Sequence, residues 1–289
     1  MLLLLVACAD KLAPPQKADE TGEAAACLDP RPAYGGCAAT VTVTDATTGA
    51  TLALLQRAYD ADGNLVSEGR DNGGDGSVES IVTTTYDGDG NALTVSVDAN
   101  GDGTADSVVT NTWDTDGNVL TSTTDVDADG VAETYTTYTY TDGDLATVDV
   151  DQDGDGAADL TCTASYAAAG DGEVATVTCT DTEGATVNHT VTTFDATGEP
   201  IARESDANGD GTVDLEEAWT RDPDTCLVTA SASTSTRQQE EDTVTREEDT
   251  TLVYDADHRV ASSTTHIVTT SSEGEMVQDV ASSAAYTCE

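Results

Sequence analysis

Residues 86–91 read YDGDGN, and close copies of this hexapeptide begin 27 residues before it and 27 residues after it. The copies are YDADGN at 59–64 and WDTDGN at 113–118, and looser versions follow as YTDGD, FDATGEP and YDADHRV. The Asp-Gly step supplies the positive φ angles that a tight hairpin turn requires. Each copy therefore predicts a turn between two strands, and the fixed period predicts an internal repeat.

Between these turns, β-branched residues alternate with polar ones, as in ALTVSV at 92–97 and DSVVTNTW at 106–113. This alternation is typical of strands that have one buried and one exposed face. An acidic loop separates the two strands of each repeat, so tight turns should lie along one edge of the sheet and acidic loops along the other. The prediction is an all-β protein, an antiparallel meander of ~27-residue β-hairpin repeats that forms an extended, curved or solenoid-like sheet.

Aromatic residues mark the repeat. They recur every 27 residues at Tyr59, Tyr86, Trp113 and Tyr140, and more loosely at Tyr166, Phe194 and Trp219. Residues one repeat apart lie two strands over and face the same way. We expect them to form a column that packs successive repeats together.

The turns carry a family resemblance. The matching residues are Tyr59-Asp60, Tyr86-Asp87, Trp113-Asp114, Phe194-Asp195 and Tyr254-Asp255, with Gly63, Gly90, Gly117 and Gly198. They resemble the YD repeats of Rhs-type bacterial surface proteins over roughly residues 55–260. The resemblance implies β-hairpin repeats in an extended curving sheet, and a structural, shell-like or carbohydrate-contacting role. This chain has longer acidic loops than the family and no obvious C-terminal toxin domain, so toxin delivery is not expected.

Six loops follow the same rhythm, and four of them keep acid or Asn at positions one, three, five and nine, with Gly at six. Calcium takes about six to eight oxygen ligands, and a loop that curls round the ion offers alternate side chains. The candidate ligands are Asp98, Asn100, Asp102 and Asp106; Asp125, Asp127, Asp129 and Glu133; Asp151, Asp153, Asp155 and Asp159; and Asp206, Asn208, Asp210, the Thr212 carbonyl, Asp214 and Glu217.

The loops are not equivalent. DANGDGTVDLEE at 206–217 has the full ligand set of an EF-hand loop, with Glu217 at the twelfth position. The copy that begins at Asp71 has Gly73 at the third position, and the copy that begins at Cys179 lacks the first and ninth ligands, so both should be weak or empty. Asp, Asn and Gly are also ordinary turn residues. Crowding of four carboxylates in DVDADGVAE favours a bound cation over a simple turn.

Calcium is the expected metal. Magnesium demands tighter octahedral geometry, and zinc and copper prefer His or thiolate ligands. The three histidines, His189, His258 and His266, lie outside these loops. The formal charge of -46, with ten Lys and Arg, makes cations natural partners and excludes a basic footprint for nucleic acid or an anionic membrane surface. Adaptation to high salt is the alternative explanation of the charge.

The N-terminus predicts export. Residues 1–8, MLLLLVAC, resemble a lipoprotein signal peptide that ends at a lipidated Cys8, although no basic residue precedes the apolar run. Residues 9–26 are expected to be a flexible tether. The expected location is a bacterial outer membrane or cell surface, with a lipid anchor in the membrane.

Six further cysteines favour disulfides in an exported chain. A turn at Gly170-Asp171 would place Cys162 opposite Cys179 on a hairpin. The remaining pairs are expected to be Cys27 with Cys37 and Cys226 with Cys288. Residues 27–54 are then an N-terminal cap with a small disulfide loop, 55–225 the repeats, and 226–289 a degenerate C-terminal cap.

The leading hypothesis is a calcium-stabilised, lipid-anchored extracytoplasmic repeat protein that acts as a structural or binding surface element. Carbohydrate or another surface protein are candidate partners. One alternative is a dockerin-like partner-docking module, for which LEEAWTRD after Asp214 would begin a helix. Another is a hydrolase of extracellular polysaccharide. No nucleophile elbow, metallo-hydrolase His motif or phosphate loop is present, so an enzyme is not expected.

Overall fold

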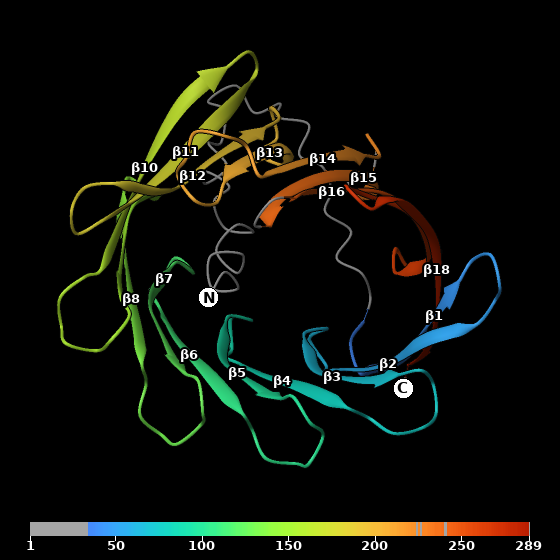
Figure 1. Cartoon of the computed structure of the whole chain (residues 1–289). Helices are drawn as coiled ribbons and strands as arrows, with labels where there is room; N and C mark the ends of the chain where they lie inside the picture. Colours follow the sequence, from blue (N-terminus) through green and yellow to red (C-terminus); the bar gives the residue numbers. More distant parts are fainter. Residues whose placement is uncertain (1–33, 224, 226, 240–241, 289) are drawn as a thin grey trace.

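The computed structural model describes residues 34–223, 225, 227–239 and 242–288, which form one antiparallel sheet of 18 strands. Each strand pairs with its neighbours in sequence, and β1 (Cys37–Asp45) also pairs with β18 (Gly274–Cys288) over nine residues. The sheet therefore closes into a barrel (Figure 1). The predicted antiparallel meander is confirmed, but the prediction of an extended or solenoid-like sheet is wrong. The twist that accumulates from strand to strand brings the first and last strands together.

The strands between these two follow the chain without a crossover. They are β2 (Thr51–Tyr59), β3 (Leu65–Asn72), β4 (Ser80–Tyr86), β5 (Ala92–Asp98), β6 (Ser107–Trp113), β7 (Val119–Asp125), β8 (Thr134–Thr141), β9 (Asp144–Asp151), β10 (Leu160–Ala169), β11 (Gly172–Asp181), β12 (Thr186–Phe194), β13 (Pro200–Asp206), β14 (Leu215–Arg221), β15 (Val228–Gln239), β16 (Asp242–Tyr254) and β17 (Val260–Ser271). Sequence assigned to terminal caps thus supplies β1 and β15 to β18 of the same ring. LEEAWTRD continues as strand β14 and not as the helix that the dockerin alternative needs.

The two rims of the barrel differ. The tight turns that follow β2, β4, β6, β12 and β16 lie at one end, and the acidic loops that follow β3, β5, β7, β9 and β13 lie at the other, together with the short turns at 181–185 and 272–273. In the tight turns the Asp carboxylate organises the backbone. Asp87 accepts hydrogen bonds from the Asp89 and Asn91 amides, and the Asn91 side chain donates a further bond to it. Gly90 in this turn has a φ of 84°, which explains why glycine recurs there.

The two faces of the sheet also differ. Along β6, Asn111 and Trp113 are half-buried, whereas Thr110 and Thr112 are exposed. Exposed threonines form cross-strand hydroxyl pairs, such as Thr112 with Thr121 at 2.7 Å. The largest group of buried apolar residues comprises Tyr138, Leu145, Val148, Cys162, Val177 and Cys179. In β6 the exposed face is thus polar, although other strands expose apolar side chains such as Leu120 and Val253.

The aromatic residues at the turns hydrogen-bond to the backbone of the preceding repeat, and the predicted column of aromatics stays a prediction. Tyr86 donates a hydrogen bond to the carbonyl of Leu65 at the start of the neighbouring strand β3. Trp113 and Tyr140 make the equivalent bonds to Ala92 and Val119. These contacts hold each repeat to the one before it.

The predicted disulfide between Cys162 and Cys179 is confirmed, and these residues face each other in the β10–β11 hairpin, which turns at Gly170 and Asp171. The other predicted pairings are corrected, because Cys37 bonds to Cys288. The two termini meet only after the barrel closes, so their partnership has no local signal in the sequence. Cys27 and Cys226, like Cys8 and the tether at 9–26, lie outside the described residues. Over the part of the chain that the structure describes, no helix is long and apolar enough to cross a membrane.

Candidate metal centres at the acidic rim

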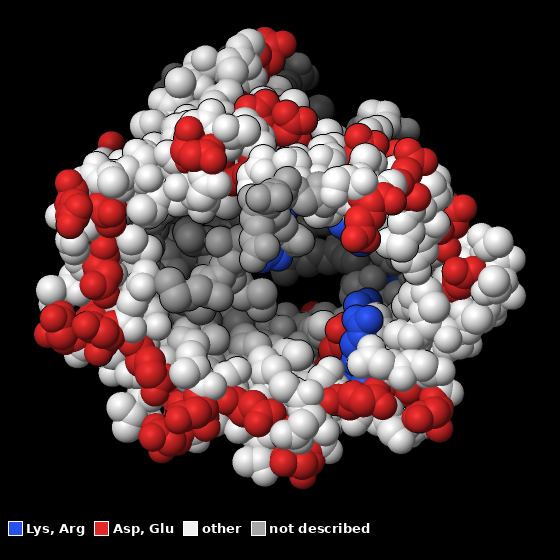
Figure 2. Space-filling view, viewed as in Figure 1, with Lys and Arg blue, Asp and Glu red and all other residues white. Residues whose placement is uncertain are grey.

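The loops that follow β3, β5, β7, β9 and β13 make up most of one rim, here called the acidic rim. Figure 2 shows Asp and Glu gathered over the outer loops of the ring, whereas the Arg side chains visible in this view lie beside the hollow at its centre. The negative charge is therefore concentrated where the loops project into solvent. A soluble cation can reach it there.

The first Asp of each loop is bound by the loop backbone. Asp98 accepts hydrogen bonds from the amides of Gly101 and Gly103, at 2.7 and 2.8 Å. Burial acts to raise the pKa of Asp98, but these backbone hydrogen bonds outweigh it and hold the pKa below its ordinary value. The same balance lowers the pKa of Asp151 and Asp206. The carboxylates of Asp98, Asp151 and Asp206 are thus favoured in the charged form and fixed by the backbones of their loops.

The ninth residue closes each loop at its base. The Asp106 amide donates to the Val97 carbonyl at 2.7 Å, and its carboxylate accepts from the Ala99 amide at 2.7 Å. The equivalent residues make the same two kinds of contact and are Glu79, Glu133, Asp159 and Asp214. The ninth acid is therefore a structural part of the loop as well as a candidate ligand.

Three of these loops bring carboxylates together. In each, one oxygen or more from every member lies within 4.8 Å of the others. The groups are Asp125, Asp127, Asp129 and Glu133; Asp71, Asp75 and Glu79; and Asp151, Asp153 and Asp155. Two oxygens that each bind one calcium ion at about 2.4 Å can be at most ~4.8 Å apart. The spacing is therefore compatible with a single hard cation held by each group.

The loop at Asp125 has the largest set, since all four of its predicted acidic ligands converge. The loop at Asp151 brings together the first three of its predicted ligands, while Asp159 accepts a hydrogen bond from the Gln152 amide at 2.7 Å. Sequence reasoning expected little from the loop at Asp71, because Gly73 occupies its third position. The prediction did not include Glu79 as a ligand. A Glu at the ninth position could have indicated it, because its longer side chain reaches Asp71 and Asp75.

The loops at Asp98 and Asp206 have the same backbone arrangement, with Asn at the third position, but their acids are not among the groups of three or more that converge in the described residues. The Asn100 side-chain oxygen accepts from the Asp102 amide at 2.9 Å, and Asn208 does the same for Asp210 at 2.8 Å. In both loops the fifth Asp accepts from the seventh residue, so Thr212 donates its amide to Asp210 at 2.8 Å. Asp214 closes the second loop.

Glu217 does not join the Asp206 loop. It lies within β14, three residues beyond Asp214, and pairs in register with Arg203 of β13. Arg203 Nε donates to Glu217 Oε2 at 2.6 Å. The prediction of Glu217 as a twelfth-position ligand is therefore corrected. In an EF-hand the twelfth residue starts a helix that folds back on the ion, whereas a strand carries it away along the sheet.

Comparison with known proteins finds no matching family model and no matching curated protein. A porin-like protein from Bacteroides uniformis is 14% identical at a TM-score of 0.43, covering 88% of this chain and 97% of that one. A porin-like protein from Bacteroides vulgatus is 11% identical at 0.32, covering 85% and 97%. The Photorhabdus luminescens Tc holotoxin pore is 11% identical at 0.32, covering 78% of this chain and 15% of that one. These scores are too low to carry an argument about function.

Proposed function

We propose that this chain is a calcium-stabilised, extracytoplasmic barrel of YD-like repeats that acts as a structural or binding element of a bacterial surface. The observation that supports the proposal is the convergence of Asp125, Asp127, Asp129 and Glu133 at the acidic rim. Four carboxylates at this spacing repel one another unless a cation lies among them. Calcium is the favoured cation because every donor is an oxygen and the loop imposes no strict octahedral geometry.

The proposal includes an anchor and an outer surface. Cys8 would carry the lipid and hold the barrel at the membrane. The exposed threonine rows would then face the surroundings, where carbohydrate or another surface protein are the proposed partners.

Calcium titration tests the proposal. When the free calcium concentration is one hundred times the Kd of a site, binding adds roughly 2.7 kcal/mol to the free energy of unfolding. Extracellular sites have Kd values of about 10⁻⁴ to 10⁻³ M, so ~10 mM calcium should raise the melting temperature by several degrees relative to EDTA. Magnesium, and sodium at matched ionic strength, should raise it less.

A pair of matched variants locates the effect. Asp125→Asn with Asp127→Asn removes two charges from the acidic rim, whereas Asp62→Asn with Asp116→Asn removes two from exposed tight turns. Only the first variant should lose calcium, measured by calorimetry and by mass spectrometry of bound metal. Equal responses of the melting temperature to calcium and sodium would show that the charge serves general salt adaptation.

A further inference from the structure

The seam at which β1 and β18 close the barrel carries a disulfide with unusual surroundings. Cys37 and Cys288 form the first pair of the β1–β18 register and lie at the rim of tight turns. Cys37 is only 2% exposed but Cys288 is exposed, whereas both residues of the other described disulfide, Cys162 and Cys179, are buried at 2% and 1% exposure. A reagent in solution therefore meets the seam disulfide first.

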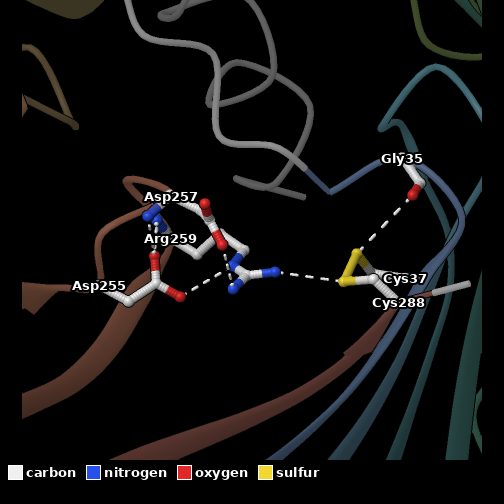
Figure 3. Close-up of a disulfide and its surroundings, with 6 residues drawn as sticks. All are labelled: Gly35, Cys37, Asp255, Asp257, Arg259 and Cys288. Atoms are coloured by element: carbon white, nitrogen blue, oxygen red, sulfur yellow. Dashed lines mark hydrogen bonds and ion pairs between the residues drawn. A yellow bond between two sulfur atoms is a disulfide. The ribbon is translucent and has the colours of Figure 1, made fainter.

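The turn at 255–259 departs from the repeat beside this disulfide. Where the earlier turns have Asn, this turn has Arg259, whose Nε keeps the expected hydrogen bond to the turn Asp, here Asp255, at 2.8 Å. Its Nη2 donates to Asp257 at 2.7 Å, and its Nη1 lies 3.2 Å from Cys288 Sγ. Figure 3 shows the guanidinium between the two carboxylates of the turn and the sulfur.

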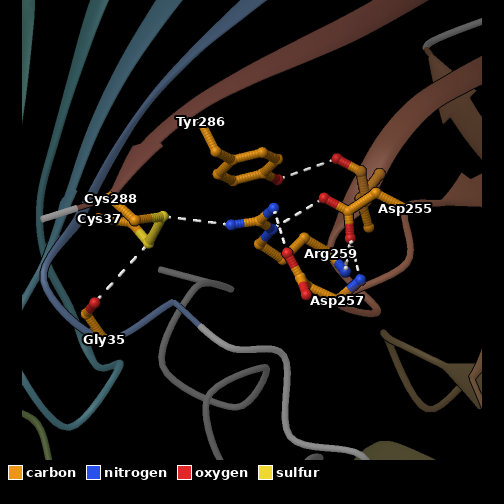
Figure 4. Close-up of polar contacts among 8 residues, drawn as sticks. Gly35, Cys37, Asp255, Asp257, Arg259, Tyr286 and Cys288 are labelled. Atoms are coloured by element: carbon orange, nitrogen blue, oxygen red, sulfur yellow. Dashed lines mark hydrogen bonds and ion pairs between the residues drawn. A yellow bond between two sulfur atoms is a disulfide. The ribbon is translucent and has the colours of Figure 1, made fainter.

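Tyr286 completes the arrangement. The Arg259 guanidinium lies 4.8 Å from the centre of the Tyr286 ring, and the Tyr286 hydroxyl donates to the Val260 carbonyl at 2.9 Å (Figure 4). The cation is thus held against β18 by contacts on three sides. A fixed positive charge beside a sulfur stabilises that sulfur as a thiolate.

We propose that the Cys37–Cys288 disulfide is a redox-sensitive latch, which an external dithiol reduces in preference to Cys162–Cys179 and whose reduction loosens the barrel seam. A thiolate of the dithiol attacks the exposed Cys288 Sγ, a mixed disulfide forms at Cys288, and Cys37 leaves as a thiolate. The second thiol then attacks the dithiol sulfur of the mixed disulfide and releases Cys288 as a thiolate beside Arg259. The dithiol becomes a cyclic disulfide, and its two electrons reduce the protein disulfide to two thiols.

Loosening of the seam would affect a pocket that lies beside it. A pocket of about 340 Å³ lies along it, lined by residues of the four adjoining strands. Its apolar lining includes Val41, Leu55, Val280 and Ala284, and Arg57 and three serines line the rest of it with other residues. While the latch is closed, Val41 is buried and Leu55, Val280 and Ala284 are half-buried. After reduction, the β1–β18 backbone pairing holds the seam without a covalent bond, and this apolar surface becomes more exposed.

The order of reduction is the first test. Free thiols of the full-length protein are blocked with N-ethylmaleimide, dithiothreitol is added, and newly released thiols are trapped with iodoacetamide and mapped by mass spectrometry. Cys37 and Cys288 should be labelled at least about tenfold faster than Cys162 and Cys179. Equal rates, or the reverse order, would overturn the proposal.

The consequence of reduction is the second test. Hydrogen exchange should increase in β1 and β18 but not in β10 and β11, and binding of an apolar fluorescent dye should increase. The double variant Cys37→Ser with Cys288→Ser should show the same changes without reductant, whereas Cys162→Ser with Cys179→Ser should leave the seam unchanged. Unaltered exchange in β1 and β18 after complete reduction would show that the disulfide is not a latch.

Arg259 is tested by the rate of reduction. Arg259→Gln removes the charge that stabilises the departing Cys288 thiolate, so reduction should become several-fold slower. Arg259→Lys keeps the charge and should retain most of the rate. Reduction of Arg259→Gln at or above the original rate would show that Arg259 shields the disulfide and does not activate it.

Discussion

Tyr86 Oη donates a hydrogen bond to the carbonyl oxygen of Leu65 at 2.9 Å. Tyr86 ends β4 and Leu65 begins β3, so the bond joins the turn end of one repeat to that of the preceding one. Trp113 and Ala92 repeat this relationship at 2.9 Å, and Tyr140 and Val119 at 3.0 Å. The 27-residue period therefore specifies a polar bond as well as a packing contact.

Tyr86→Phe should lower the free energy of unfolding by about 1 kcal/mol, because it leaves the Leu65 carbonyl without this donor. Urea unfolding measures the loss. Tyr135→Phe is the matched control, since Tyr135 is 41% exposed, and its effect should be close to zero. Equal effects of the two substitutions would mean that the bond contributes nothing to stability.

Ala128→Gly should stabilise the loop between β7 and β8. Ala128 has a φ of 54°, whereas the equivalent positions of neighbouring loops are Gly101 and Gly154, each with a φ of 71°. The left-handed conformation costs a residue with a Cβ about 1 kcal/mol, which glycine avoids. The free energy of unfolding should rise by a similar amount in urea titrations performed in EDTA.

The reciprocal control is Gly103→Ala. Gly103 has a φ of 88° and nothing near enough to meet an added Cβ, so only the backbone conformation is penalised. This variant should lose stability by about the amount that Ala128→Gly gains. A gain from both substitutions would contradict the conformational explanation.

Acid should weaken the acidic rim. The pKa of Asp98 is held below the ordinary value of 3.8, because backbone hydrogen bonds outweigh the opposing effect of burial. The contribution of such a group is fully present above 3.8 and is lost as pH falls through its lowered pKa. Thermal melts in EDTA between about pH 6 and pH 3 should therefore show a smaller acid-induced loss for Asp98→Asn than for the unchanged protein. Parallel curves would show that these bonds do not favour the charged form.

His266 predicts the opposite dependence. Its protonated Nδ1 donates a 2.6 Å hydrogen bond to the Asp279 carboxylate, and this contact raises its pKa above 6.5 despite the opposing effect of desolvation. The contribution of the pair is fully present below pH 6.5 and is lost as pH rises through the raised pKa. NMR titration of the ring should show a midpoint above 6.5 that falls in Asp279→Asn. An unchanged midpoint in that variant would exclude Asp279 as the cause.

The hairpin register could be predicted because its causes are local. Gly170 and Asp171 fix the turn, and strand pairing then leaves Cys162 opposite Cys179. Closure of the barrel could not be predicted in this way. Cys37 and Cys288 are separated by 251 residues, and their meeting depends on the number of strands and the twist accumulated along all of them.

At the acidic rim, the prediction of metal ligands failed in part for a different reason. The spacing of the loops correctly located the carboxylates that converge at Asp125 and Asp151. The EF-hand motif misled at Glu217, because side chains alternate along a strand and this position meets Arg203 across the sheet. At Glu79 the motif underestimated the loop. The long Glu79 side chain joins Asp71 and Asp75, although Gly73 supplies no ligand at the third position.

The pairing of β1 with β18 gives every described strand two hydrogen-bonded neighbours. An open sheet of this composition would end in strands whose free N–H and C=O groups could accept a strand from another molecule. Segments rich in Thr and Val and poor in Pro are prone to such stacking. Closure of the barrel removes both free edges of the sheet. A chain composed largely of β-strands is therefore protected from aggregation by edge-to-edge pairing with other copies.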